Sequence, residues 1–318
     1  MDAKISTIAA GQGGVILRRQ ALKAGFSDLE IKQRIRTREW TAIRRGAYVD
    51  TTAWGSMDEL TQHQTRVHAV VLGLKGPLGI SHVSACVVAG IPLWSPDLSN
   101  VHITRPPGVS TRKEAGVWHH SARLPDDHVI HVAGLPLTMP SRTVIDTACV
   151  TGFEASVVVA DGFLREGLVT PDELLDMLDS MRDCPGSRNA GRVVEFADGK
   201  SESVGESRTR VLLDAAGMPR PELQVTVETG DRADFLIREY RTIVEFDGKQ
   251  KYGRLLGPND DPTEVVWREK RREDRLRDAG YEVVRIVWSE LTQVLLIAKR
   301  LQRAFARAKR RHGSRLAV

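Results

Sequence analysis

Two short apolar stretches decide how the C-terminal third of this sequence folds: ADFLI at residues 233–237 and TIVEFDG at residues 242–248. Each has the length and composition of a buried β-strand, yet each carries a carboxylate in its interior, Asp234 in the first and Glu245 in the second. Asp247 follows Glu245 by two positions, so their side chains share a face if the strand continues. Because a carboxylate in a buried strand is costly unless its charge is compensated, these positions predict a binding site.

Outward from these strands, residues 200–318 predict one domain with the element order αβββαβα. The expected elements are a helix at 202–216, strands at 223–228, 233–237 and 242–246, a helix at 262–279, a strand at 281–287 and a final helix. Gly217 and Gly280 each follow a predicted helix, as expected for a residue that ends helices in the left-handed conformation.

The carboxylates of this domain predict a cation site. Two carboxylates on neighbouring strands can converge on a hard divalent cation such as Mg2+ or Mn2+, and Glu206 on the preceding helix offers a third. Such a cation polarises a phosphodiester and generates a hydroxide nucleophile. Lys249 and Lys251 lie just beyond, where an ammonium group can steady developing charge. The alternative is that Asp247 and Gly248 form a simple turn at an exposed strand end.

The arrangement Asp234, Glu245-x-Asp247-Gly on an αβββαβα frame resembles the PD-(D/E)XK nuclease superfamily, particularly the branch similar to very-short-patch-repair (Vsr) endonucleases. The stretches EFDGKQKYG and WREKRREDRLRDAGYEVVRI are similar to that branch. The resemblance implies a restriction-endonuclease-like domain that cleaves DNA with Mg2+. It implies Asp234 and Glu245 as catalytic metal ligands, joined by Glu206 or Asp247.

One position departs from the superfamily pattern. The lysine of these nucleases stands two residues after the glutamate, where this sequence has Asp247. The lysine role would therefore pass to Lys249, Lys251 or Lys270, and the departure puts efficient catalysis in doubt more than the fold.

The helix expected at 262–279 has a basic surface that suits DNA. Its candidate DNA contacts are Arg268, Lys270, Arg271 and Arg272. The alternative is that these residues pair along the helix with Glu269, Glu273 and Asp274.

Residues 1–50 predict three small helices and a basic hairpin, the pattern of a winged helix-turn-helix domain. Ser27 and Glu30 have the spacing of a capping box, which starts the third helix. Its expected apolar side consists of Leu29, Ile31 and Ile35. In this fold the third helix enters the major groove while basic side chains neutralise phosphates. The candidate DNA contacts are Lys32, Arg34, Arg36 and Arg38 on and after the helix, and Arg44 and Arg45 in the hairpin. A winged helix that binds only protein is the alternative.

Residues 51–199 predict an α+β domain and a linker. The expected helices span 60–74, 82–89, 142–150, 154–166 and 171–180, and the expected strands span 101–104, 116–119 and 135–137. A polar stretch at 182–200, rich in glycine and serine, predicts the linker to the next domain.

For the histidines of this middle segment, the sequence favours structural roles over catalytic or metal-binding ones. Ser81 and Ser84 flank His82, and we expect them to be helix caps rather than nucleophiles. His119 and His120 are adjacent, but no second pair of ligands stands at a useful spacing, so we expect a strand end rather than a metal site.

Three stretches of the first two segments carry a second resemblance: GGVILRRQALKAGFSDLEIKQRIRTREWTAIRRGAYV, ISHVSACVVAGIPLW and LPLTMPSRTVIDTA. They resemble the AbiEi antitoxins of type IV toxin–antitoxin systems. The resemblance implies a winged helix followed by an α+β domain, operator binding and transcriptional autoregulation. It also implies a possible partner, a nucleotidyltransferase-type toxin.

Charge and composition favour a nucleic-acid partner in a reducing compartment. The chain has 318 residues and a net charge of +5. From Arg18 to Arg45 it has 9 Lys/Arg against 3 Asp/Glu, and from Glu264 to Val318 it has 15 against 7. Two basic ends suit a polyanion, although solvated helix faces would look the same. The 3 cysteines form no CxxC pair, and neither a signal peptide nor an 18-residue apolar run is visible, so we expect a cytoplasmic protein without a membrane span.

Two functional hypotheses follow. The first is a DNA-binding, metal-dependent Vsr-like endonuclease directed to DNA by its own winged helix. The alternative is an AbiEi-type antitoxin and autorepressor whose nuclease-like domain is catalytically weak or inactive. The sequence leaves open the oligomeric state and the DNA sequence recognised.

Overall fold

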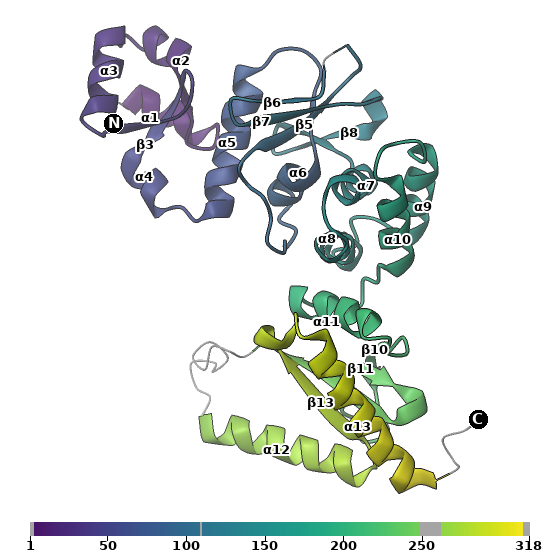
Figure 1. Ribbon diagram of the computed structural model, residues 1–318. Helices are drawn as coiled ribbons and strands as arrows, with labels where there is room; N and C mark the ends of the chain where they lie inside the picture. The colour runs from purple at the N-terminus through teal and green to yellow at the C-terminus, as the bar shows by residue number, and fades with distance from the viewer. Residues whose placement is uncertain (1–2, 109, 249–261, 314–318) are drawn as a thin grey trace. The chain divides into compact units, whose positions relative to one another are not determined.

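Three β-sheets with their helices make up residues 3–108, 110–248 and 262–313, which are the residues that this computed structural model describes (Figure 1). The chain divides into two units. The first comprises residues 1–163 and 167–196, and the second comprises 164–166 and 197–318. Both antiparallel and mixed sheets are present, so the predicted multidomain α+β class is confirmed. The predicted first and middle segments lie together in the first unit, up to Phe196.

The N-terminal part of the first unit combines three short helices with a small sheet. The helices are α1 (Ala3–Ala10), α2 (Arg18–Lys23) and α3 (Asp28–Arg36), and the strands are β1 (Ile16–Leu17), β2 (Trp40–Arg44) and β3 (Ala47–Asp50). Strand β3 lies between β1 and β2 and pairs with both in antiparallel fashion. Gly46 in the β2–β3 turn has φ +74°, a conformation that glycine adopts without strain. The sequence did not predict β1, because a two-residue strand is defined only by its pairing.

Helix α3 starts at the predicted capping box. The Ser27 hydroxyl accepts a hydrogen bond from the Glu30 amide, and the Glu30 carboxylate accepts one from the Ser27 amide. Ile31 is buried, as expected, against the hairpin. The prediction that Leu29 faces the core is wrong, because its side chain is 75% exposed. Leu29 lies two residues before Ile31, roughly 200° away around the helix, and so faces solvent.

A six-stranded mixed sheet with the order β6-β7-β5-β4-β9-β8 forms the centre of the middle segment. Its strands are β4 (Gly79–Ile80), β5 (Val101–Arg105), β6 (Arg112–Glu114), β7 (Val117–Ser121), β8 (Val129–Val132) and β9 (Leu135–Thr138). Its helices are α4 (Thr51–Ser56), α5 (Glu59–Gly73), α6 (His82–Val88), α7 (Pro140–Val150), α8 (Phe153–Arg165), α9 (Pro171–Ser180), α10 (Ser187–Phe196) and the 3-10 helix η1 (Asp126–His128). Ile80, Val101 and Ile103 pack with Val67 and Val70 of α5 in an apolar core.

The predicted linker at 182–200 is contradicted over most of its length. Residues Ser187–Phe196 form α10, whose Ala190 and Val193 are buried and which packs against α7 and α9. Ala190 is followed by Val193 and Val194 at helical spacing, so the polar and glycine-rich composition concealed an amphipathic helix.

The second unit has the predicted order of elements, αβββαβα. They are α11 (Val204–Ala215), β10 (Glu222–Thr226), β11 (Arg232–Ile237), β12 (Thr242–Asp247), α12 (Pro262–Asp278), β13 (Glu282–Val287) and α13 (Val294–His312), with the 3-10 helices η2 (Arg238–Tyr240) and η3 (Trp288–Glu290). The sheet order is β10-β11-β12-β13, in which β12 and β13 are parallel and the other neighbours antiparallel.

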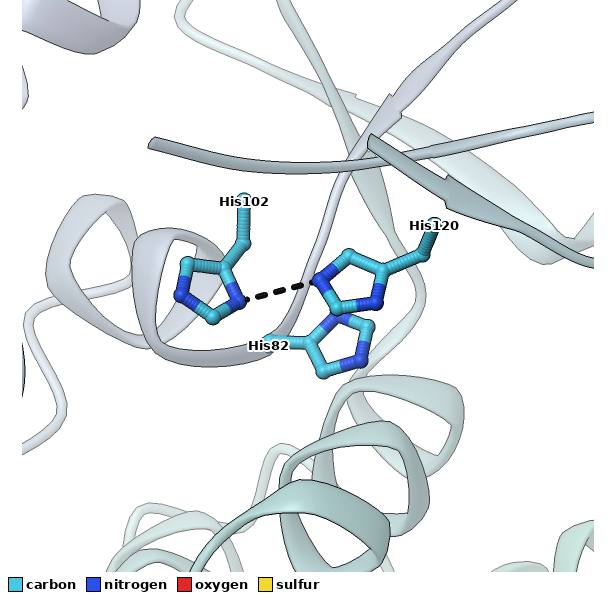
Figure 2. Close-up of side chains that lie close together, drawn as sticks. All are labelled: His82, His102 and His120. Carbon is cyan, nitrogen blue, oxygen red and sulfur yellow. Dashed lines mark hydrogen bonds between the residues drawn. The ribbon is translucent and has the colours of Figure 1, made fainter. Parts of the chain in front are cut away.

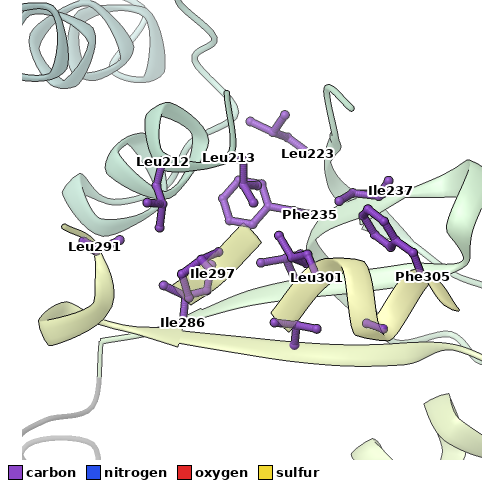
Figure 3. Close-up of a cluster of buried hydrophobic side chains, with 13 residues drawn as sticks. Leu212, Leu213, Leu223, Phe235, Ile237, Ile286, Leu291, Ile297, Leu301 and Phe305 are labelled. Atoms are coloured by element: carbon purple, nitrogen blue, oxygen red, sulfur yellow. The ribbon is translucent and has the colours of Figure 1, made fainter. Parts of the chain in front are cut away.

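Helices cover both faces of this sheet. On one face, Phe235 and Val244 pack with Leu213 of α11 and with Ile297 and Leu301 of α13 (Figure 3). On the other face, Leu236 and Ile243 pack with Leu276 of α12. The two apolar cores hold the strands from both sides. The polar side chains described below lie beyond these cores, where the pairing of β11 and β12 ends.

In the part of the chain that the structure describes, no helix is long and apolar enough to cross a membrane.

Truncation of Phe235 tests the core of the second unit. Phe235 is fully buried, so Phe235→Ala should destabilise this unit by about 3–5 kcal/mol through lost contacts and a residual cavity. The measurement is hydrogen exchange of the β11 and β12 amides in the full-length protein. Leu295→Ala is the matched control, because Leu295 on α13 is 76% exposed and its loss should change the free energy by less than about 0.5 kcal/mol. Equal effects of the two substitutions would contradict this packing.

Candidate functional site

The pairing between β11 and β12 ends where the two central carboxylates begin. The last residues paired across the strands are Phe235 and Val244. The next residues along the two strands are Asp234 and Glu245. Here the backbone N–H of Phe246 donates to Asp234 Oδ2 at 3.0 Å, rather than to a carbonyl of the neighbouring strand. The Asp234 carboxylate therefore lies at the junction where the strands separate.

Several neighbours of the Asp234 carboxyl shift its pKa in opposite directions. Burial raises its pKa above the ordinary value, the hydrogen bond from the Phe246 amide lowers it, and the negative charge of Glu206 raises it further. Arg272 and Arg232 act in the opposite direction, and the net shift is upward. Glu206 and Asp234 are thus electrostatically coupled, as two carboxylates of one site would be.

Gly205 allows the first turn of α11, which contains Glu206, to lie close to Phe246. A Cβ added to Gly205 would stand 1.9 Å from Cε1 of Phe246, so only glycine lets the first turn of α11 approach this ring. Phe246 is the same residue whose amide Asp234 holds. The close approach therefore brings the N-terminal turn of α11, with Glu206 next in sequence, to the strand junction.

Glu206 is buried and held by three donors. Its carboxylate accepts hydrogen bonds from the Glu202 amide at 2.9 Å, the Ser203 hydroxyl at 2.8 Å and Nε2 of Gln224 at 2.8 Å. Its own amide donates to Ser203 Oγ, the N-cap of α11. These contacts fix the side chain in one orientation.

Gln224 is a site residue that the sequence interpretation missed. Its backbone is left-handed at φ +53°, which points its side chain out of the regular strand pattern towards Glu206. Among the described residues, its buried Oε1 has no hydrogen-bond partner. A glutamine in a strand gives no signal in a single sequence; the left-handed backbone and the unpaired oxygen identify it.

Two arginines compensate the negative charge of Glu245. Its Oε1 lies 2.6 Å from Nη1 of Arg272, an ion pair without hydrogen-bond geometry, and Nε of Arg285 lies 3.4 Å from Oε2. Arg285 stands beside Glu245 in the β12–β13 pairing and also reaches Glu273 of α12 at 3.2 Å. Arg272 additionally donates to the Arg232 carbonyl at 2.7 Å. A predicted DNA contact, Arg272, is therefore joined to a predicted metal ligand.

The other predicted residues of this unit are more peripheral. Asp247 is half-buried at the end of β12, opposite Val287. Lys249 and Lys251 lie outside the described residues. Lys270 is exposed, with its ammonium 5.5 Å from the centre of the Trp267 ring, and Arg268 and Arg271 are exposed on α12.

The carboxylate oxygens at this junction are ligands that a hard cation prefers, but the positions of the described carboxylates do not form a cation site. In residues 3–108, 110–248 and 262–313, only one group of three or more possible ligand residues has its ligand atoms within 4.8 Å of one another, and it consists of histidines of the first unit. Glu206, Asp234 and Glu245 are each held by protein donors instead. The described carboxylates therefore do not form a ready-made Mg2+ site, and Arg272 would have to leave Glu245 to open one.

In the first unit, α3 and the β2–β3 turn present several predicted DNA contacts to solvent. Lys32, Arg36, Arg38 and Arg45 are exposed. Arg38 follows α3 with φ +58°, where the chain turns into β2. These four exposed side chains form a basic surface on the helix and the hairpin tip that a polyanion can contact.

Arg34 and Arg44 are held within the protein. The Arg34 guanidinium lies 5.1 Å from the centre of the Phe26 ring and 5.4 Å from that of Trp40, and it pairs with Glu39. Burial lowers the pKa of Arg44. Its Nη1 is buried, with no hydrogen-bond partner in the described part of the chain. Both arginines therefore contribute packing inside the unit rather than an open surface.

Comparisons with known proteins give relatives without an assigned activity. No family model matches the chain. Two curated proteins of Mycobacterium tuberculosis, the "Uncharacterized protein MT2308" of strain CDC 1551 and the "Uncharacterized protein Rv2248" of strain H37Rv, are 27% identical over 238 residues. The matched region covers 70% of this chain and 83% of each relative.

Among solved structures, the crystal structure of the RV2827C protein from Mycobacterium tuberculosis matches with a TM-score of 0.40 and 13% identity. The match covers 61% of this chain and 77% of that one. A likeness this weak carries no argument about fold or function.

Asp234→Asn tests the charge balance at the junction. The amide oxygen can still accept from Phe246, but the charge is lost. Because the folded state raises the pKa of Asp234, it binds the proton more tightly than the unfolded state, so the wild type loses stability as pH rises through this pKa. The variant should therefore unfold at higher denaturant concentration than the wild type at neutral pH, with little difference in acid.

Asp231→Asn is the control with the opposite sign. A hydrogen bond from Arg275 holds the pKa of Asp231 below its usual value, so its contribution to stability is present at neutral pH and lost in acid. The Asn variant should be less stable at neutral pH. If Asp234→Asn also destabilises the protein at neutral pH, the assignment of a disfavoured charge at position 234 is wrong.

Proposed function

We propose that this chain is a DNA-binding protein whose C-terminal unit is an endonuclease domain of the PD-(D/E)XK type, similar to Vsr endonucleases, which hydrolyses DNA phosphodiesters with Mg2+ or Mn2+. The observation that carries the proposal is the junction on the αβββαβα frame, where the β11–β12 pairing ends at Asp234 and Glu245 and where the charge of Glu206 acts on Asp234. Carboxylates gathered against their mutual repulsion are costly, and such a cost is typical of functional sites.

The N-terminal part supplies the proposed contact to DNA. Its three helices and its β1-β3-β2 sheet support the proposal of a winged helix-turn-helix, in which α3 would be the recognition helix and the β2–β3 hairpin the wing. Exposed Lys32 and Arg36 on α3 and Arg45 at the hairpin tip support this reading. Basic side chains on helix and wing neutralise phosphates, which supplies most non-specific affinity.

Arg272 couples DNA to the carboxylates in this proposal. Its guanidinium pairs with Glu245, and its side chain is 21% exposed, so it can reach an arriving polyanion. A DNA phosphate offers the same bidentate acceptor geometry as a carboxylate. Exchange of Arg272 from Glu245 to a phosphate would remove the nearer of the two arginines that hold Glu245 only when DNA is bound. A bound cation would supply the polarisation of the phosphodiester.

A second function is favoured by the same ion pair. Glu245 is held by two arginines, and Asp247 stands in the place of the superfamily lysine. In this alternative, the second unit is a catalytically weak DNA clamp. The chain is then an AbiEi-type autorepressor, with a nucleotidyltransferase-type toxin as the implied partner.

Replacement of Lys32 and Arg36 by alanine tests the DNA-binding surface. The loss of two phosphate contacts should weaken binding to duplex DNA and flatten the plot of log affinity against log salt concentration by about two units. Arg182→Ala is the control, because Arg182 is exposed in the same unit but lies outside α3 and the hairpin. An unchanged salt slope in the double variant would contradict the assignment of α3 to DNA.

Cleavage of supercoiled and linear DNA with Mg2+, Mn2+ or EDTA separates the two functions. Metal-dependent nicking should fall by more than about 100-fold in Glu245→Gln, because a lost metal ligand is worth several kcal/mol. Nicking by the control variant Glu222→Gln should be unaffected, since Glu222 at the start of β10 is exposed and pairs with Arg238 of η2. Retained DNA binding without any nicking, on substrates of varied sequence and structure, would favour the autorepressor.

A further inference from the structure

Three histidines from separate elements converge in the first unit. They are His82 at the start of α6, His102 in β5 and His120 in β7, and their ligand atoms all lie within 4.8 Å of one another. Figure 2 shows the three imidazole rings gathered below the strands, with a hydrogen bond between His102 and His120. Of the described residues, these make the one group of this kind.

Strand pairing brings two of the rings to one face of the sheet. Strands β5 and β7 are parallel, with His102 beside Trp118 and Thr104 beside His120. Trp118 and His120 are two residues apart and so point to the same side. There the Trp118 ring stacks on the His120 ring at 4.8 Å between ring centres and packs tilted against the His102 ring at 4.9 Å. His119 points to the opposite side.

The third ring comes from a strained backbone. His82 has φ +54°, a conformation uncommon for a residue with a side chain. Its Nδ1 contacts Ser81 Oγ at 2.8 Å, and Ser81 Oγ in turn accepts from the Thr104 hydroxyl at 2.8 Å. This network fixes the ring by one nitrogen and leaves Nε2 for another partner. Such strain, held in place by surrounding contacts, is characteristic of functional positions.

The three imidazoles are in the neutral form that binds metals. His82 and His102 are each 4% exposed. Burial lowers the pKa of His82 well below its ordinary value, that of His102 to about 4 and that of His120 to about 3. The neighbouring charges of Lys113 and Arg142 act in the same direction. A neutral imidazole has one nitrogen lone pair that a metal ion can bind.

The spacing of two ring nitrogens suits tetrahedral zinc. His120 Nε2 and His102 Nδ1 are 3.2 Å apart. Two nitrogens bound at about 2.0–2.1 Å from a tetrahedral zinc ion lie about 3.3–3.4 Å apart. The zinc ion would replace the hydrogen bond between these atoms. The His82 ring, which stacks 3.8 Å from that of His120, would turn to direct Nε2 at the same ion.

An open position is available beside the histidines. A cavity of about 220 Å³ is lined by His102, Trp118 and Asp97 and by residues of α7 and α8, such as Thr147 and Val159. A zinc ion with three protein ligands keeps a fourth position for water or for a small ligand, as catalytic zinc sites do.

We propose that His82, His102 and His120 form a zinc site whose fourth position opens to this cavity. Three imidazole nitrogens and no carboxylate favour zinc over Mg2+, which prefers oxygen ligands. The site is separate from the carboxylates of the second unit and does not depend on the function proposed for them. The Ser81 hydroxyl orients one of the ligands from outside, the usual role of a partner to a metal-bound histidine.

Calorimetric titration of zinc chloride into chelator-treated full-length protein tests the site. We expect one zinc ion per chain, without competition from Mg2+. His120→Gln should lower the affinity by more than about 100-fold, because loss of even an outer partner costs 10–100-fold. His119→Gln is the matched control, a buried histidine next in sequence that faces the other side of the sheet, and it should bind zinc as the wild type does.

A spectroscopic measurement keeps the test independent of how the variants fold. Co2+ added to the wild-type protein should give the strong visible absorption of a tetrahedral site, and zinc should displace it. The proposal is overturned if the wild type takes up no zinc, if Co2+ shows only the weak bands of an octahedral aquo ion, or if folded His119→Gln loses zinc to the same extent as His120→Gln.

Discussion

The hydrogen bond from the Phe246 amide to the Asp234 carboxylate is the contact on which the second unit's polar centre depends. The regular pairing of β11 and β12 stops at Phe235 and Val244, and this side-chain hydrogen bond links the two strands beyond that point. The Phe246 ring receives Gly205, whose missing side chain lets α11 approach. Glu206 arrives beside Asp234 as a consequence, on the scaffold that the two cores of the sheet hold rigid.

The energetics of this centre explain why arginines surround it. Glu206 and Glu245 are buried and Asp234 is partly buried, and the charge of Glu206 raises the pKa of Asp234. Glu245 is compensated by Arg272 and Arg285, and Glu206 by three hydrogen-bond donors. Asp234 has the least compensation, since only its bond to Phe246 and more distant arginines oppose burial. A charge left disfavoured in this way is a feature that folding alone would not retain.

Much of the fold followed from the sequence, and the reasons are local. The capping box at Ser27, the glycines after the helices and the apolar strands around Asp234 each determine structure within a few residues. Glu206, Asp234 and Glu245 could be named because carboxylates in buried elements stand out against their neighbours. Leu29 and α10 were misjudged, since composition does not define which side of a helix faces the core.

The residues that escaped prediction depend on contacts between distant segments. Gln224 joins the centre through a left-handed backbone that no single sequence reveals. His120 looked like half of an adjacent pair with His119, yet strand alternation separates those two and joins His120 to His102 and His82. Arg34 and Arg44 looked like fully exposed charges, whereas ring contacts at Arg34 and partial burial of Arg44 hold them against the protein.

The central claim is that the Asp234 junction is the functional centre of the second unit, opened when DNA draws Arg272 away from Glu245. The most direct measurement is a Mn2+ titration of isotopically labelled full-length protein bound to a DNA duplex with a non-cleavable backbone, followed through the amide NMR signals. The account predicts that the signals of Phe246 and Glu206 broaden first, and that Glu245→Gln suppresses this broadening. Sharp signals at Phe246 and Glu206, while amides elsewhere broaden, would contradict it.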